Sequence, residues 1–199
     1  SFRREVMRRI IGVFVTLSVF VFTSPAFGFQ WKPDLDHAEI RFEVNHILTT
    51  VTGTFGKFES DVEFNPEKPE KAKFNFTVDV SSVNTKNGKR DNHLRSKDFF
   101  DVDKYPEMSF KSSKVTSKGG NMYQVEGTMT IKNVSKKMAV DFEFKGPVMH
   151  PFNKKKVGGF VSKFTIPRLE YGVGNGKFLK MGVVGEMVNV VLEGEAFAD

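Results

Sequence analysis

The sequence predicts an all-β fold of eight antiparallel strands, closed into a barrel or packed as a sandwich. Apolar and polar residues alternate through eight short segments, which is the pattern of strands with one buried and one wet face. Turn signals separate most of the segments, so neighbouring strands are expected to pair antiparallel. The wet faces carry charged residues such as Glu39, Arg41 and Lys73, which argues against an outer-membrane barrel with an apolar outside.

The first three strands are expected at residues 38–45, 51–64 and 71–80. In the first and the third, every second residue is apolar. The second changes the parity of its apolar residues near Gly56, which predicts a β-bulge that lets both halves face the same core.

The other five strands show the same alternation, and the last two are separated by a glycine-rich loop over residues 171–185. These five strands are expected at residues 108–115, 123–131, 138–144, 160–166 and 188–196.

A long interruption, residues 84–110, lies between the third and fourth strands and is predicted to be a helical or irregular insert. It is longer than a hairpin connection needs, and inserts of this kind in compact sheets usually carry function. We expect Leu94, Phe99, Phe100 and Tyr105 to dock it on the barrel as a lid or mouth.

Residues 1–28 are predicted to be a signal peptide that is cleaved. Arg8 and Arg9 give it a positive start, residues 10–22 form an apolar run without charge, and small residues ending at Gly28 supply a cleavage site. The apolar run is too short to span a bilayer comfortably. An uncleaved membrane anchor is the alternative.

Cleavage would leave residues 29–199 as one exported domain, periplasmic or secreted. Met7 is a natural initiator, so residues 1–6 are expected to lie ahead of the natural start. The chain has no cysteine, which rules out disulfides, Cys-ligated metals and thiol catalysis.

The net charge of the chain is small when the predicted leader is excluded. The whole chain carries +6, and the leader supplies +3 of this from four arginines and one glutamate, which leaves +3 for the domain. Basic and acidic residues are interspersed along the strands, whereas a nucleic-acid module gathers basic residues on one face. Nucleic acid is therefore not expected as a partner, and the run Lys154 to Lys156 is interpreted as a solvated turn.

Six sequence blocks lie in order over nearly all of the predicted domain: DLDHAEIRFEVNHI, VTGTFGKFES, FNPEKPEKAKFNFTVDVSSVNT, RDNHLRSKDFFDVDKYPEMSFKS, EGTMTIKNVSKKMAVDFEF and IPRLEYGVG. Together they resemble successive blocks of the YceI-like family of exported bacterial proteins. The RDNHL and FFDVDKYP pair is the most specific, because it joins an unusual insert to a fixed strand entry. Two departures are Ala38, where the family often has serine, and Asn133, where glycine is common.

The resemblance implies a lipocalin-like, polyisoprenoid-binding barrel that encloses a long apolar chain. The expected function is that of an exported binding protein, not an enzyme, that stores or transports an isoprenoid-type lipid. The lipid would be a polyprenyl phosphate, an isoprenoid quinone or another long apolar chain. The alternative is a structural or stress-response envelope module with a filled core and no ligand.

Cavity-lining candidates are the apolar residues that alternation places on the inward face, together with two phenylalanines of the insert. Core and cavity wall share this pattern, so the same residues could simply pack against one another. The candidates are Phe42, Val44, Phe74, Phe76, Val78, Phe99, Phe100, Phe110, Phe142, Phe144, Phe160 and Phe164.

The polar head of such a lipid would need donors or cations near a mouth, because guanidinium groups bind phosphates and carbonyls well. The alternative is an internal salt bridge, for example between Arg90 and Asp91 or Asp98, that only fixes the insert. The head-group candidates are Arg90, Asp91, His93, Arg95 and Arg168.

No metal site, catalytic site or cofactor is predicted apart from the bound lipid. His37, with Asp34 and Asp36 nearby, is the best metal candidate, but no two histidines have ligand spacing. Nucleophile and metalloprotease motifs are absent from the sequence. A transient membrane contact and a dimeric state are both compatible with the sequence.

Overall fold

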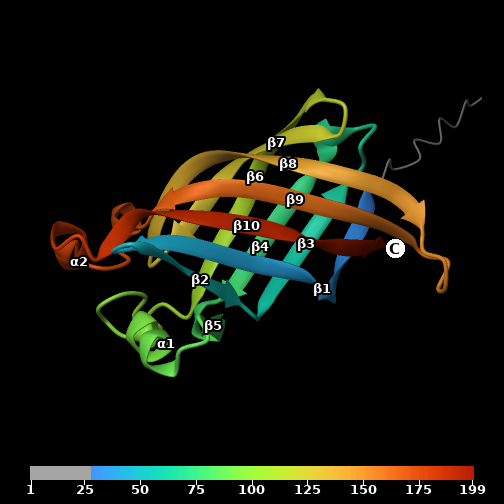
Figure 1. The fold of residues 1–199 in the computed structure, drawn as a ribbon. Helices are drawn as coiled ribbons and strands as arrows, with labels where there is room; N and C mark the ends of the chain where they lie inside the picture. The colour runs from blue at the N-terminus through green and yellow to red at the C-terminus, as the bar shows by residue number, and fades with distance from the viewer. Residues whose placement is uncertain (1–27) are drawn as a thin grey trace, which may run out of the picture.

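The computed structural model of the chain describes residues 28–199, and the predicted leader lies outside the described residues except for Gly28. Neighbouring strands pair antiparallel in the order β10-β9-β8-β7-β6-β4-β3-β1, and β10 pairs with β1 to close the sheet (Figure 1). The predicted eight-stranded antiparallel barrel is confirmed. The strands are β1 (Phe29–His46), β2 (Thr49–Phe55), β3 (Phe58–Phe64), β4 (Lys73–Asp79), β5 (Val83–Asn84), β6 (Glu107–Gly119), β7 (Met122–Ile131), β8 (Val134–Met149), β9 (Lys156–Pro167) and β10 (Val184–Ala198).

The predicted bulge near Gly56 is a full break in the strand. β2 pairs with β1 as a hairpin, while β3 pairs with β4 and meets only the beginning of β1, at Phe29 to Trp31. Phe55 and Phe58 nevertheless both belong to apolar clusters inside the barrel. The change of apolar parity near Gly56 therefore marks the point where the chain changes its strand partner. β2 and β3 lie along different parts of the same edge of β1.

β1 begins nine residues earlier than its alternation predicts, at Phe29 instead of Ala38. Its register against β10 is interrupted between Pro33 and Ala38, where β1 has extra residues. Pro33 cannot donate to a ladder, and Asp34 and Asp36 occupy the parity that is apolar from Ala38 onward, so the pattern that signals a strand is lost there. Trp31, which the sequence left outside every predicted strand, is consequently a core residue with 1% exposure.

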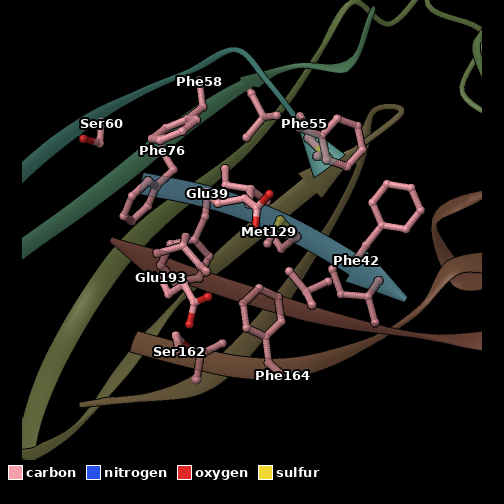
Figure 2. A pocket seen from close by; sticks show the side chains of 18 of the residues that line it. Glu39, Phe42, Phe55, Phe58, Ser60, Phe76, Met129, Ser162, Phe164 and Glu193 are labelled. Carbon is pink, nitrogen blue, oxygen red and sulfur yellow. The ribbon is translucent and has the colours of Figure 1, made fainter. Parts of the chain in front are cut away.

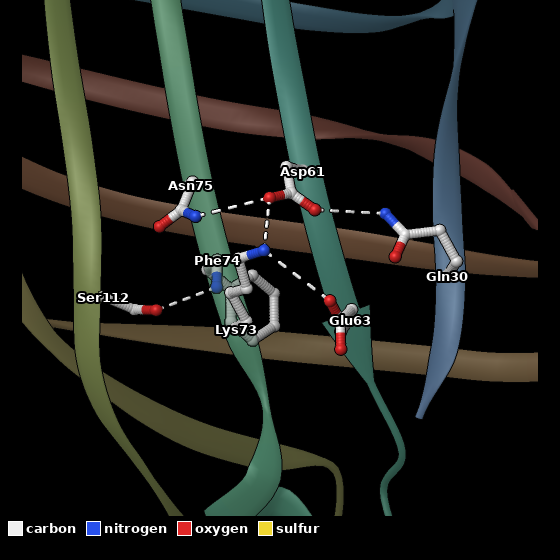
Figure 3. A network of polar contacts seen from close by, with 7 residues as sticks. All are labelled: Gln30, Asp61, Glu63, Lys73, Phe74, Asn75 and Ser112. Atoms are coloured by element: carbon white, nitrogen blue, oxygen red, sulfur yellow. Dashed lines mark hydrogen bonds and ion pairs between the residues drawn. The ribbon is translucent and has the colours of Figure 1, made fainter. Parts of the chain in front are cut away.

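The outer face of the barrel is polar, as the alternation predicts. The Lys73 ammonium lies 2.6 Å from the Asp61 carboxylate, and Gln30 donates to the other oxygen of Asp61 at 3.2 Å (Figure 3). This hydrogen bonding to the charged form holds the pKa of Asp61 below its ordinary value. The network ties β1, β3 and β4 together on the wet side.

The insert contains α1 and a series of turns, and the α-helices α1 and α2 both lie at one end of the barrel (Figure 1). The Asn87 side chain accepts a hydrogen bond from Arg90 N, which caps the start of α1. No helix within residues 28–199 has the length and apolar character needed to cross a membrane. The helical elements are η1 (Pro69–Lys71), η2 (Val80–Ser82), α1 (Gly88–Arg95), η3 (Arg168–Tyr171) and α2 (Lys177–Lys180).

The two ends of the barrel differ. The end that carries α1, α2 and the β1–β2 turn is called the insert end below. The opposite end carries the β6–β7 and β8–β9 turns and is called the aromatic end, because aromatic rings fill it.

Candidate functional site

A cavity of about 250 Å³ lies inside the barrel between the two ends. Inward side chains around its middle, such as Phe58, Phe76, Met129 and Phe164, are only partly buried although they face the interior (Figure 2). Their remaining exposure faces this space. The barrel core is therefore not filled, which favours the binding interpretation over the alternative of a filled core without a ligand.

The aromatic end is closed by tightly packed rings. Phe64 is 0% exposed and meets Tyr123 and Phe144 edge to face, at centroid distances of 5.0 and 5.1 Å. Trp31 packs edge to face on Phe144 at 5.5 Å, and its indole Nε1 donates to Phe64 O at 2.9 Å. Because the buried indole N–H has a partner, this end forms a satisfied core that borders the cavity at Trp31.

The insert end is closed by apolar side chains of two separate segments. Leu94, Phe99 and Phe100 of the insert line the cavity, as does Val173 in the loop before α2. The Phe99 ring stacks on Phe178 of α2, with centroids 5.9 Å apart and planes 13° from parallel. The cover over this end is therefore assembled from the insert and the α2 segment.

Polar contacts with the backbone stabilise the insert internally and tie it to the segment that precedes it. Asp91, buried at 6% exposure, accepts from Thr85 N at 2.8 Å and from Thr85 Oγ1 at 2.5 Å. Arg90 donates to Thr85 O at 2.8 Å, and Arg95 donates to Ser81 O and Val83 O, both at 2.8 Å. The predicted alternative of an internal salt bridge between Arg90 and Asp91 or Asp98 is wrong, because Arg90 instead donates hydrogen bonds to Thr85.

Arg168 is the one head-group candidate that lines the cavity. It is 5% exposed, and it donates to Val173 O at 2.8 Å, Val184 O at 3.3 Å and Gly185 O at 2.7 Å. Burial disfavours the charged form and lowers the pKa of its guanidinium. These carbonyl dipoles compensate the charge and fix the segment after η3 against the start of β10.

The other head-group candidates lie outside the cavity lining. His93 contacts Asp98, with 3.0 Å between His93 Nε2 and Asp98 Oδ2, and its ring meets Phe99 edge to face. Arg90, Asp91 and Arg95 make the backbone contacts described above. A head-group role for these four residues stays a prediction, and their observed contacts all hold the insert.

All but one of the twelve lining candidates lie in the wall of the cavity. Phe144 packs against Trp31 and Phe64 in the aromatic end and is not part of the lining. The eleven that line the cavity are Phe42, Val44, Phe74, Phe76, Val78, Phe99, Phe100, Phe110, Phe142, Phe160 and Phe164.

Several lining residues were missed by the sequence prediction. Ile40, Val190 and Leu192 had the inward parity and could have been named from it, whereas Trp31 had no signal because its strand was not recognised. Met108 and Met129 are also in the lining, and their unbranched side chains adapt readily to a ligand.

The metal candidate His37 lies in an exposed ion pair. His37 Nδ1 is 2.9 Å from Asp34 Oδ2, and the third nearby ligand group is Glu195, in place of the predicted Asp36. The hydrogen bond raises the pKa of His37 and lowers that of Asp34. The ion pair accounts for this arrangement, and the cluster borders solvent.

The sequence matches the model of the YceI-like domain over residues 31–196. A UPF0312 protein of Staphylococcus epidermidis is 34% identical over 164 residues, which cover 82% of this chain and 93% of that protein. A UPF0312 protein of Vibrio parahaemolyticus is 36% identical over 123 residues, covering 61% of this chain and 65% of that protein.

Solved structures with the same fold include BcnA of Burkholderia cenocepacia, with a TM-score of 0.76 and 25% identity over 82% of this chain and 99% of that one. The Campylobacter jejuni YCEI protein has a TM-score of 0.69 and 30% identity, covering 76% of this chain and 87% of that one. A polyisoprenoid binding domain from Saccharophagus degradans has a TM-score of 0.64 over 87% of this chain and 99% of that one; at 12% identity, it shows the fold alone.

Proposed function

The chain belongs to the YceI-like domain family, and we propose that it is a binding protein whose barrel holds an isoprenoid-type lipid for storage or transport. The lipid would be a polyprenyl phosphate, an isoprenoid quinone or another long apolar chain. The fold is shared with a domain that is described as polyisoprenoid binding. Binding, and not catalysis, is the activity that the site supports.

The apolar cavity is the observation that carries this proposal. Its wall consists mainly of phenylalanine, methionine and aliphatic side chains, and the Ser162 hydroxyl in the lining already donates to Asp141 O at 2.7 Å. Moving one methylene group from water into such a space is worth about 0.8 kcal/mol. A chain without polar groups therefore gains from every carbon that enters.

The volume and lining also bear on the length of the ligand. A cavity of about 250 Å³ is slightly smaller than the usual ligand pockets, which span about 300 to 1,000 Å³. Met108 and Met129 can change rotamer to lengthen the space. We therefore propose that short prenyl chains enter the barrel as it stands and that longer chains require these methionines to move.

Export is part of the proposal and rests on the first residues of the chain. Arg8 and Arg9 precede a charge-free apolar run, and small residues follow it. A protein that shields an apolar chain is useful where lipids must cross water between membranes. We propose a periplasmic or secreted location, which fractionation of the producing cell would test.

The single tryptophan gives a direct binding assay. Trp31 borders the cavity, and a quinone that enters should quench its fluorescence at close range. Titration with a short-chain ubiquinone should give saturable quenching, which the matching prenyl alcohol should compete away. A wild-type protein that shows no saturable quenching and takes up no prenyl compound would overturn the proposed function.

Two neighbouring positions on β10 provide a matched pair of variants for this assay. Val190 faces the cavity and Val191 faces outward between Arg41 and Lys163. Val190→Phe should fill the space and weaken quinone binding at least tenfold, whereas Val191→Phe adds the same ring outside and should bind like the wild type. Equal binding by both variants would place the ligand somewhere other than the cavity.

A further inference from the structure

We propose that the insert end docks on an anionic lipid bilayer through an exposed apolar patch on the cover of the cavity. The patch consists of Ile47 and Leu48 in the β1–β2 turn and Leu179 and Met181 at α2. This inference rests on the proposed function, because it names the source from which the barrel would take its lipid.

Large apolar side chains are unusually exposed at this patch. Leu48 is 95% exposed, Ile47 65%, Met181 61% and Leu179 37%. Single exposed apolar residues are ordinary on a protein surface, but several on adjoining segments indicate an interaction site.

Backbone hydrogen bonds join the two segments that carry the patch. Ile47 N donates to Val183 O at 3.1 Å, and Val183 N in turn donates to Phe178 O at 2.8 Å. His46 also pairs with Val184 at the edge of the barrel. The β1–β2 turn and the α2 segment therefore form one continuous surface, at the left of Figure 1.

The same α2 segment faces the cavity on its other side. Val173 and Val184, which flank it, line the cavity, and Phe178 stacks on the lining residue Phe99. The outward patch and the inward cover are thus two faces of one segment. A bilayer that contacts the patch would lie directly against the cover of the lipid site.

Charge favours an anionic lipid surface as the occupant of the patch. Lys177 and Lys180 are exposed on α2 among the apolar residues. Neither lysine pairs with a carboxylate in the part of the chain that the structure describes. Lysines beside apolar side chains that enter the interface are typical of peripheral membrane proteins, since each lysine attracts anionic head groups.

The aromatic end has an exposed apolar turn as well, but it does not lead to the cavity. Phe152 is 89% exposed, Met149 is 58% exposed, and Lys154 follows in the same turn. Behind this turn the barrel is closed by the Trp31 and Phe64 core. A membrane at the aromatic end could not exchange a lipid with the cavity, so this turn provides the matched control.

Vesicle co-sedimentation tests the inference. Wild-type protein should bind phosphatidylcholine vesicles that contain phosphatidylglycerol and should bind pure phosphatidylcholine vesicles more weakly. Leu48→Asp combined with Met181→Asp should weaken partitioning to the anionic vesicles at least tenfold, because two apolar anchors are replaced by repelled charges. Phe152→Asp combined with Met149→Asp should partition like the wild type. Leu48→Asp alone should partly weaken binding to the anionic vesicles. Because Leu48 is exposed and lies outside α2, this loss cannot come from misfolding of α2.

The outcomes separate this inference from the proposed function. Absence of wild-type binding to anionic vesicles, or loss of binding only in the Phe152 and Met149 variant, would overturn the docking surface. The same holds if Leu48→Asp turns a dimer into a monomer in sedimentation velocity, because a second copy would then be the occupant. Quinone quenching of Trp31, measured without vesicles, should be unchanged in the patch variants, and its failure in the wild type would instead overturn the proposed function.

Discussion

The two ends of the barrel close the same cavity by different physical means. At the aromatic end, rings of Trp31, Phe64, Tyr123 and Phe144 belong to the strands themselves and pack edge to face. At the insert end, the cover consists of added segments that lie across the strand ends and are held by side-chain contacts with backbone carbonyl and amide groups.

This difference shows which end can open. Separating the rings of the aromatic end would disrupt several strands, whereas the insert and the α2 segment lie outside the barrel strands and pack on them through the cluster around Phe99 and Val173. Loops and lids that cover binding sites are drawn from the low-stability part of a protein. We therefore assign stability to the aromatic end and propose that a bound lipid would exchange at the insert end.

The largest effect is expected at the aromatic end. Phe64→Ala should lower the free energy of unfolding by about 3 to 5 kcal/mol, because the ring is fully buried and meets rings on several strands. Denaturant titration measures this loss, with Phe152→Ala at an exposed position of the same end as the control. A loss below about 1 kcal/mol would mean that this end is not the core.

A medium effect, confined to the insert, is expected from Asp91→Ala. The substitution leaves the amide and hydroxyl of Thr85 without their shared acceptor, which should cost about 1 to 3 kcal/mol. Amide hydrogen exchange should rise over residues 84–105 while the strands stay protected. Asp98→Ala, at an exposed contact, is the control, and uniform exchange through the whole barrel would contradict a separate cover.

The smallest effect concerns the ion pair of Asp34 and His37 in the interrupted part of β1. The carboxylate raises the pKa of His37 and the imidazole lowers that of Asp34. The pair therefore contributes to the stability of the fold at pH values between the ordinary pKa of an aspartate and that of a histidine, roughly pH 4 to 6.5. The contribution fades as pH rises through the raised pKa of His37 or falls through the lowered pKa of Asp34. NMR titration of His37 should show its pKa return toward the ordinary value in Asp34→Asn, and an unchanged pKa would remove this interaction.

The alternation of apolar and polar residues made most of the barrel predictable, because each strand has one apolar face toward the interior and one polar face toward solvent. It also placed Phe74 and Phe142 correctly on the inner wall. Alternation could not distinguish a residue of the cavity wall from one of the packed aromatic end, since Phe144 has the same parity as Phe142. Only the position of a side chain along the barrel axis decides between the two. The resemblance to the YceI-like family was confirmed by the domain match.

The polar part of the site could not be predicted from the sequence. Arg90, Arg95 and Arg168 bind backbone carbonyls, and every residue has a carbonyl, so residue identity carries no signal for such a partner. The early start of β1 was hidden for a related reason, because Pro33 and its acidic neighbours interrupt the alternation although the strand continues.

On the proposed function, the space between the two ends holds a lipid. The most direct measurement is mass spectrometry of an organic extract from the purified protein, with the Val190→Phe variant extracted in parallel. We expect the wild type to yield a prenyl-type lipid at close to one molecule per chain and the variant to yield much less. Equal lipid from both proteins, or none from the wild type even after incubation with prenyl compounds, would show that the cavity does not hold the lipid.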